Sequence, residues 1–302
     1  KGRERAAPPG RRGGPGGRGR PMAPLSSPLD SFRWYAGDRE QQAIYWICAA
    51  LLSQFGLAGA VLVSGINAPY GRYNQAVDKA ERGPVMRLLA ACDVPARLAW
   101  VLQECPNLLA AVACWLTGSA ECKGNLGNRI SLLCFATHYV NRTLVYPLRM
   151  QGSKPVPLPV MLMAMGFCSV NGYIQCRSLT RFLVLPADAW HMPLGVALWG
   201  CGLYINMDSD SILRNLRKPG EVGYKIPHGG LFEYVSGANF FGEILEWLGY
   251  ALAAGGALPA ATFAFCTALN IGPRALAHHR WYLEKFQDEY PKERKALIPF
   301  LL

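Results

Sequence analysis

Long hydrophobic runs without charged residues alternate with short polar segments along most of the chain. A bilayer-spanning helix needs about 20 mostly apolar residues, and five runs are long enough. A further segment, 130–148, contains His138 and Arg142 and gives a weaker signal. The last clear run contains Pro259, which fits either one long helix or parts of two adjacent helices. The five clear runs are 41–71, 98–120, 155–176, 189–207 and 247–273.

This pattern predicts an all-α integral membrane protein with about seven transmembrane helices, formed by one domain over residues 41–302. The basic residues predict which loops face the cytosol. If the N-terminus lies outside the cytosol, the cytosolic segments hold 17 Lys and Arg residues and the opposite loops hold four. The cytosolic segments are then 72–97, 149–154, 208–235 and 274–302, and the opposite loops are 121–129 and 177–188.

Composition supports this class and sets the N-terminus apart. Of the 302 residues, 51% are hydrophobic and only 17% are charged, whereas soluble domains have about 25% charged residues. The net charge of +11 owes much to residues 1–20, which hold seven Lys and Arg residues and one Glu. Such a Gly/Pro/Arg-rich stretch cannot bury a core. We therefore expect residues 1–40 to be a disordered or non-native leader and N-terminal tail, with Met22 as an alternative start.

Two binding functions are disfavoured by the same sequence. The basic leader admits a nucleic-acid-binding arm, but we predict no nucleic-acid partner, and no obligate protein partner is evident. The ten cysteines form no Cys-x-x-Cys pair and most lie inside hydrophobic runs. We therefore predict buried free thiols and no metal site.

Polar residues at membrane depth recur at helical spacing, although each is costly there. With 100° per residue, four stripes each fall within a narrow arc of their helix. One interpretation is that these side chains join the helices through hydrogen bonds and ion pairs. The other is that the stripes line one cavity near the cytosolic ends of the helices. The stripes are Asn206, Asp210, Arg214 and Arg217; Asn239, Glu243, Glu246 and Tyr250; Tyr139, Arg142 and Tyr146; and Arg274, His278 and Tyr282.

The chemistry of the stripes favours a phosphorylated cofactor. Arg142, Arg214, Arg217 and Lys225 suit a multiply charged phosphate, and the Asn and carboxylate groups suit ribose hydroxyls and an amide. A pyridine nucleotide has all these features. Since no Gly-x-Gly-x-x-Gly motif follows a strand pattern, a Rossmann fold is excluded and the cofactor site must be built by helices.

Several stretches resemble the steroid 5-alpha-reductase family, and their sequences are most similar to those of its type 1 members. The similarity extends from about residue 69 to the C-terminus and is most specific in the last hundred residues. It implies a seven-helix enzyme of the endoplasmic reticulum membrane that uses NADPH to reduce the delta-4 double bond of 3-oxo steroids. The resembling stretches include Gly223-Tyr-Lys-Ile-Pro227, Leu231-Phe-Glu-Tyr234, Asn239-Phe-Phe-Gly-Glu243, His278-His-Arg-Trp-Tyr-Leu283 and Lys295-Ala-Leu-Ile-Pro-Phe300, together with 206–220.

The resemblance also implies roles for individual residues. Gln103, Glu104 and Tyr139 match the positions that bind the steroid, and Glu104 and Tyr139 match the pair that holds its C3 carbonyl. Glu104 is the only charge in its run, so it is either a carboxyl group facing a buried substrate or a carboxylate at the membrane interface. The positions that match NADPH contacts are Arg142, Tyr146, Asn206, Asp210, Arg217, Tyr224, Lys225, Asn239, Glu243, Arg274, His278 and Tyr282.

The sequence departs from the family pattern at three places. Cys105 stands where leucine is usual, Met207-Asp208 replaces Ile-His, and Asn270-Ile-Gly-Pro273 precedes Arg274, which Pro273 could tilt. Other functions remain open. They are a reductase of related C-terminal sequence acting on trans-2-enoyl-CoA or polyprenol, a membrane methyltransferase using S-adenosylmethionine, and a transporter or scaffold without activity.

Overall fold

The computed structural model describes residues 38–64, 92–151, 154–217, 221 and 223–302. Within these residues the chain is helical and forms no strand; its β-type contacts are isolated bridges between Val94 and Val156 and between Val235 and Lys295. Almost all of the predicted leader lies outside the described residues. The long helices are α1 (Arg39–Val63), α3 (Ala96–Thr117), α5 (Leu126–Val140), α7 (Leu158–Arg177), α8 (His191–Asn215), α9 (Ala238–Ala253) and α10 (Leu258–Phe286).

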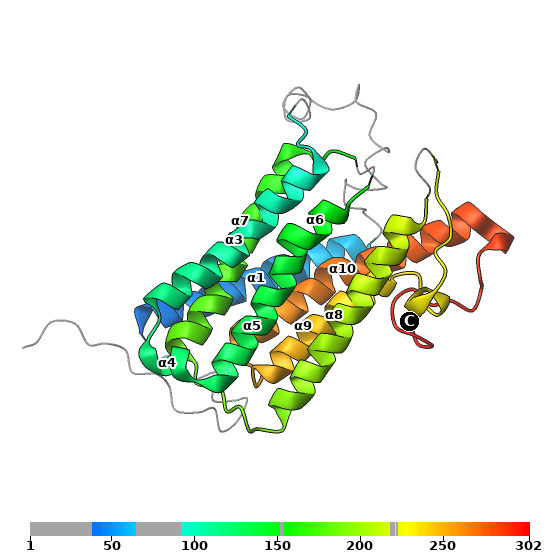
Figure 1. Ribbon diagram of the computed structural model, residues 1–302. Coiled ribbons are helices and arrows are strands. Elements are labelled where there is room, and N and C mark those ends of the chain that lie inside the picture. The colour runs from blue at the N-terminus through cyan, green and yellow to red at the C-terminus, as the bar shows by residue number, and fades with distance from the viewer. Residues whose placement is uncertain (1–37, 65–91, 152–153, 218–220, 222) are drawn as a thin grey trace, which may run out of the picture.

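Shorter helical segments extend or connect these helices. The π-helical turn η4 (Asn141–Val145) and α6 (Tyr146–Arg149) continue α5, and the π-helical turn η5 (Ser178–Phe182) continues α7. The others are α4 (Ala120–Gly124) and the 3-10 turns η6 (Gly230–Glu233) and η7 (Gln287–Glu289). In the bundle, α3 packs against α7, α8 against α9, and α1 against α10, while α5 lies between the α3–α7 pair and the α8–α9 pair (Figure 1).

Where the marked segments lie within the described residues, each is occupied by helix, so the all-helical fold is confirmed for this part of the chain. The last run proves to be parts of two helices, because α9 ends at Ala253 and α10 begins at Leu258, one residue before Pro259. Three helical stretches are long and apolar enough to cross a membrane: Arg39–Val63, Ala96–Thr117 and Leu158–Phe182. The count of seven spans stays a prediction.

Large apolar side chains cover the outside of the bundle. Leu109, Leu133, Met163, Tyr204 and Phe265 are each more than half exposed, although they lie on long helices. A water-soluble protein rarely exposes so many large apolar side chains along its helices. This surface is what a lipid environment requires, in agreement with a membrane protein.

The contact between α8 and α9 is unusually close because glycines interlock there. A Cβ atom added at Gly202 would lie 2.2 Å from the backbone nitrogen of Glu246, and one added at Gly249 would lie 2.3 Å from that of Trp199. Gly195 and Gly242 approach the opposite backbone in the same way. Small residues let helix backbones approach closely in a membrane, so the seven-residue spacing of Gly195 and Gly202 and of Gly242 and Gly249 determines where α8 and α9 meet.

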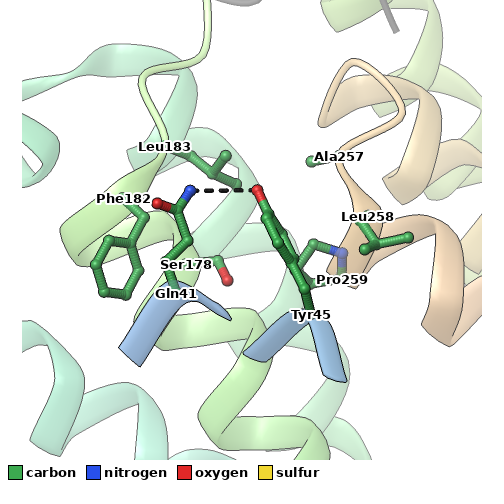
Figure 2. Close-up of a pocket in the computed structure, with 8 residues that line it drawn as sticks. All are labelled: Gln41, Tyr45, Ser178, Phe182, Leu183, Ala257, Leu258 and Pro259. Atoms are coloured by element: carbon green, nitrogen blue, oxygen red, sulfur yellow. Dashed lines mark hydrogen bonds between the residues drawn. The ribbon is translucent and has the colours of Figure 1, made fainter. Parts of the chain in front are cut away.

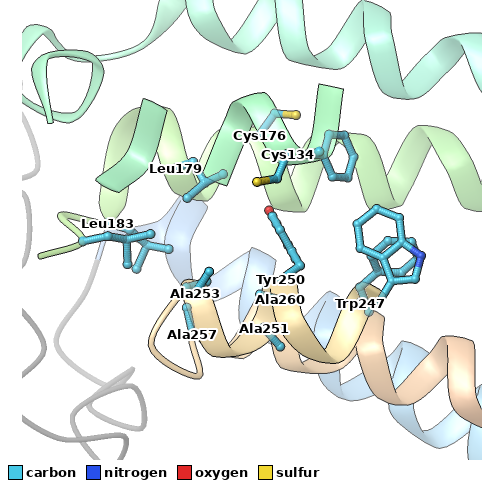
Figure 3. Close-up of a cluster of buried hydrophobic side chains, with 14 of the residues drawn as sticks. Cys134, Cys176, Leu179, Leu183, Trp247, Tyr250, Ala251, Ala253, Ala257 and Ala260 are labelled. Carbon is cyan, nitrogen blue, oxygen red and sulfur yellow. The ribbon is translucent and has the colours of Figure 1, made fainter. Parts of the chain in front are cut away.

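A second packing centre joins α5, α7, α9 and α10 around aromatic rings (Figure 3). Trp247 and Tyr250 are 1% exposed, and the Trp247 ring lies 4.3 Å from the Phe263 ring, centroid to centroid. Cys134 and Cys176 pack into the same cluster as free thiols. All ten cysteines are free and seven of them are buried, which confirms the prediction of buried thiols.

Candidate active site

A π-helical turn sets the direction of Arg142. Pro147 has no backbone N–H, so the carbonyl of Thr143 cannot receive its usual α-helical hydrogen bond. The helix widens into a π-helical turn just before Pro147, where the amide of Tyr146 donates to the carbonyl of Asn141, five residues back. Single π turns are common at functional sites because they turn side chains without ending the helix. Here the turn carries Arg142 and lies between Tyr139 and Tyr146.

Arg142 is the centre of a polar cluster formed by three of the predicted stripes. Its Nη1 lies 3.4 Å from Asp210 Oδ2 on α8, and its Nη2 lies 3.9 Å from Glu243 Oε2 on α9. The guanidinium also stacks over the rings of Trp100 at 4.6 Å and Tyr146 at 4.9 Å. The side chain is 13% exposed. The structure therefore brings together residues more than a hundred positions apart around one cation.

Asn206 and Asn239 extend this cluster along the α8–α9 contact. Asn206 Nδ2 donates to the carbonyl of Asn239 at 3.0 Å. Asn206 Oδ1 is buried and has no hydrogen-bond partner within the described residues. A buried acceptor without a donor is costly, so this oxygen marks a place where a ligand N–H or O–H would be stabilised. Arg214, one turn beyond Asp210, adds positive charge to the surroundings of Asp210 and Tyr146.

Glu104 lies on α3 and Tyr139 on α5, and both side chains form hydrogen bonds with residues of α7. Gln103 Nε2 donates to Glu104 Oε1 at 3.2 Å, and Cys168 Sγ donates to Glu104 Oε2 at 3.5 Å. One turn further along α7, Asn171 Nδ2 donates to Tyr139 Oη at 3.3 Å. The two predicted carbonyl-binding groups therefore contact α7 one turn apart, and Tyr139 lies three residues before Arg142.

Cys105 has a local structural role. Pro106 lies inside α3 and removes the hydrogen bond to the carbonyl of Leu102. The Cys105 thiol donates to that same carbonyl at 3.5 Å. A leucine could not make this contact, which gives the carbonyl of Leu102 a donor in place of the one that Pro106 lacks. Pro273 does not end α10, which continues as a regular helix through Arg274 to Phe286.

The fourth stripe lies on α10, against Phe240 of α9 and Tyr290 of the C-terminal segment. Arg274 and His278 lie against the ring of Phe240, at 5.4 Å and 5.3 Å, and Tyr282 stacks on Tyr290 at 5.3 Å. Tyr224 packs on Trp281 at 4.7 Å. Because Phe240 follows Asn239 on α9, that helix connects this group with the Arg142 cluster.

Arg217 and Lys225 lie outside both groups. Arg217 Nη1 donates to the carbonyl of Gly223 at 3.3 Å, and Lys225 pairs with Glu221. Both cations are exposed. Both lie in the segment that joins α8 to η6.

Sequence reasoning missed the part played by the C-terminal segment. Arg294 is 2% exposed and donates to the carbonyl of Pro227 at 2.9 Å; its Nη2 lies 3.3 Å from Glu233 Oε2. The Gly229 amide donates to Glu233 and holds the pKa of that carboxyl below its usual value, with Arg294 adding to the effect. Ser236 Oγ contacts Tyr290 Oη at 2.6 Å, and burial raises the pKa of Tyr290. Residues 290–297 therefore stabilise, through these hydrogen bonds, the segment that follows Tyr224 and Lys225.

Two further buried groups were not assigned a role from sequence. His138 Nδ1 lies 2.7 Å from Glu246 Oε1, in a hydrogen bond between α5 and α9. Asn171 and Gln175 are each 1% exposed on α7. The spacing of Asn171 and Gln175, four residues apart inside an otherwise apolar run, is the signal that could have revealed them.

A small pocket lies away from this cluster, at the opposite end of the bundle (Figure 2). It lies between the start of α1, η5 and the start of α10, and inside it Gln41 Nε2 donates to Tyr45 Oη at 3.2 Å. None of the predicted site residues contributes to it. Its lining is Gln41, Tyr45, Ser178, Phe182, Leu183, Ala257, Leu258 and Pro259.

Comparison of the sequence with known proteins shows the family of the chain. The sequence profile described as 3-oxo-5-alpha-steroid 4-dehydrogenase matches residues 154–302. 3-oxo-5-alpha-steroid 4-dehydrogenase 1 of Rattus norvegicus is 48% identical over 240 residues, which cover 78% of this chain and 87% of that protein. The type 1 protein of Bos taurus is 47% identical over 264 residues, 84% of this chain and 95% of that protein. The type 2 protein of Rattus norvegicus is 44% identical over 245 residues, 80% of this chain and 91% of that protein. With identity at this level across most of both chains, the resemblance found in the sequence is confirmed, and the chain belongs to the 3-oxo-5-alpha-steroid 4-dehydrogenase family.

Proposed function

We propose that this protein is an NADPH-dependent steroid 5-alpha-reductase that reduces the delta-4 double bond of 3-oxo steroids such as testosterone and progesterone. The observation that carries the proposal is that α7 contacts both Glu104 and Tyr139, one turn apart, and that Tyr139 lies three residues before Arg142, the centre of the polar cluster. A carbonyl-binding pair next to a cluster of cations and amides is what a ketone substrate and a dinucleotide require together. The names of the related proteins support the steroid.

The residues present fit NADPH. Asn206 Oδ1, buried and without a partner among the described residues, suits a donor of the cofactor. Arg142 and Arg214 supply positive charge near Asp210, and the exposed Arg217 and Lys225 supply it nearer to solvent. When bound, NADPH supplies a hydride. The remaining residues of this cofactor site are Tyr146, Asp210, Tyr224, Asn239, Glu243, Arg274, His278 and Tyr282.

The reaction adds a hydride at C5 of the enone and a proton at C4, and leaves NADP⁺. Addition at C5 moves negative charge to the C3 oxygen. A hydrogen-bond donor at that oxygen stabilises charge that exists mainly in the transition state. Tyr139 is this donor, and Glu104 either donates as well or polarises the Tyr139 hydroxyl. Gln103 orients Glu104 through its 3.2 Å hydrogen bond.

The membrane explains why both substrates can reach one site. A steroid enters from lipid, and NADPH arrives from the cytosol. A single domain of seven helices over residues 41–302, in the endoplasmic reticulum membrane, would place the Arg142 cluster at its cytosolic end and Tyr139 deeper. The exposed apolar side chains along the helices support the bilayer as the surroundings.

The test is NADPH oxidation by the purified protein in detergent or nanodiscs, with testosterone or progesterone as acceptor. We expect steroid-dependent oxidation of NADPH and a 5-alpha-reduced product identified by mass spectrometry. The rate with NADPH should clearly exceed the rate with NADH. Parallel reactions use a trans-2-enoyl-CoA, a polyprenol with a conjugated carbonyl, and S-adenosylmethionine. Turnover of the thioester or the polyprenol without the steroid would overturn the proposed substrate class.

A further inference from the structure

A line of buried side-chain amides connects the start of α10 with the hydroxyl of Tyr139. Gln175 Nε2 lies 2.7 Å from the carbonyl oxygen of Pro259 and 3.2 Å from Asn171 Oδ1. Asn171 Nδ2 in turn lies 3.3 Å from Tyr139 Oη. The hydroxyl of Tyr250 lies 3.5 Å from Gln175 Oε1. These four side chains are at most 3% exposed, so each polar atom depends on its neighbour in the line.

The carbonyl of Pro259 fixes the direction of the whole line. A backbone carbonyl can only accept a hydrogen bond, so the Gln175 atom that faces it at 2.7 Å must be the NH₂ group. The reverse orientation would place two oxygens against each other and leave both without donors. Gln175 Oε1 therefore faces Tyr250, whose hydroxyl donates to it.

The direction passes from Gln175 to Asn171. The second hydrogen of the Gln175 NH₂ group points to Asn171, so the facing atom of Asn171 must be its oxygen. Asn171 is then obliged to present its NH₂ group to Tyr139. The oxygen of the Tyr139 hydroxyl accepts this hydrogen bond, and its own proton must point elsewhere.

We infer that this amide line makes Tyr139 a fixed proton donor toward the substrate carbonyl, with Asn171 as the positioning residue. The inference rests on the proposed function, because it needs a carbonyl at Tyr139. A tyrosine hydroxyl can donate or accept, and an enzyme gains when the donating state is already set before charge develops. Pro259, at the start of α10, is thus coupled through α7 to the chemistry on α5.

The decisive variant is Asn171→Asp, which replaces the donor facing Tyr139 with an acceptor. The Tyr139 proton would turn to the new carboxylate and away from the substrate. We expect kcat to fall about 10²–10³-fold, to the level of Tyr139→Phe, with an unchanged Kd for NADPH. Asn171→Leu only frees the hydroxyl, so its kcat should fall by about 10-fold or less. The matched control is Ser169→Ala on the same helix, whose exposed hydroxyl donates to Met165, and it should retain wild-type kcat.

A purely structural role for Asn171 predicts a different result in the double variant. If Asn171 acts through the Tyr139 proton, adding Asn171→Asp to Tyr139→Phe changes kcat less than about 2-fold. If the two losses multiply, the inference is overturned. Gel filtration in detergent and the NADPH Kd report whether each variant is folded. Should Asn171→Asp not fold, Asn171→Leu and Gln175→Leu carry the test through the spectroscopic measurement below.

The second measurement does not require turnover. The infrared carbonyl stretch of a bound 3-oxo-4-ene steroid, labelled with ¹³C at C3, reports a donated hydrogen bond as a shift to lower frequency. We expect this shift in the wild type, its loss in Tyr139→Phe and Asn171→Asp, and a partial loss in Asn171→Leu and Gln175→Leu. An unchanged shift in the Asn171 and Gln175 variants overturns the inference. A wild type that binds the steroid but never oxidises NADPH refutes the proposed function instead, and the carbonyl shift still decides the direction of the line.

Discussion

The glycine contact between α8 and α9 gives a sharp test of how the site is built. In Gly202→Ala the new Cβ atom would lie 2.2 Å from the backbone nitrogen of Glu246 and 2.6 Å from its Cα. Ordinary contact begins at 3.4 Å, so the helices must separate locally by about 1.2 Å, since no flexible side chain is available to move. Overpacking of this kind typically costs about 1–3 kcal/mol of stability.

The separation also reaches the cofactor site. Asn206, one turn along α8 from Gly202, donates to the carbonyl of Asn239 on α9 at 3.0 Å. A further 1.2 Å would carry this pair to about 4 Å, beyond hydrogen-bond range. We therefore expect Gly202→Ala to lower the midpoint of thermal unfolding and to weaken NADPH binding by about 10-fold, the equivalent of one hydrogen bond.

The chain offers a matched control two residues away. A Cβ atom at Gly200 would meet nothing within 4 Å. Alanine is preferred over glycine inside a helix by about 0.5–1 kcal/mol, so Gly200→Ala should leave NADPH binding unchanged and stability equal or higher. Thermal unfolding in detergent and fluorescence titration with NADPH measure both quantities. If Gly202→Ala behaves like Gly200→Ala, the interlocked glycines do not set the position of Asn206.

Three further variants test the site residue by residue. Tyr139→Phe should lower kcat about 10²–10³-fold with an unchanged NADPH Kd, because only the carbonyl donor is lost; near-normal turnover would remove Tyr139 from the mechanism. Arg142→Lys should raise the KM for NADPH and lower thermal stability, since lysine cannot stack on Trp100 while contacting two carboxylates; a wild-type KM would argue against a cofactor contact. Arg294→Gln leaves the buried carbonyl of Pro227 without its donor and should cost about 1–3 kcal/mol of stability, with faster proteolysis at residues 223–237 as the direct readout; protection equal to wild type would contradict the fastening role of the C-terminal segment.

The helices themselves could be predicted because their signal is local. An uncharged run of sufficient length identifies a helix that avoids water, whatever its neighbours are. The boundary between α9 and α10 could not be fixed in this way, because Pro259 is compatible with the first turn of a new helix and with a kink. In the structure, Pro259 lies in the first turn of α10.

The meeting of three stripes could also be predicted, since several costly polar residues at one depth must face one another. The contacts of Arg274, His278 and Tyr282 with Phe240 and Tyr290 could not be predicted. Helical spacing shows which face of a helix is polar, but it does not show which neighbouring helix that face contacts. The same limit applies to the glycines. Their seven-residue spacing is visible in the sequence, but only the pairing of α8 with α9 shows that Gly202 meets Glu246.

The contacts between helices support the first interpretation of the polar stripes, and the interpretation as the lining of a cavity stays a prediction. Arg142 forms an ion pair with Asp210, and His138 forms a hydrogen bond with Glu246, so these contacts join the helices of the bundle. Such pairs use only part of each side chain. Asn206 Oδ1 and Glu246 Oε2 are buried without partners in the described part of the chain, and buried acceptors of that kind are rarely left so by evolution without a use. The bonds that hold the helices together therefore also fix the direction of the atoms left over, and under the proposed function we expect Asn206 Oδ1 to face the cofactor.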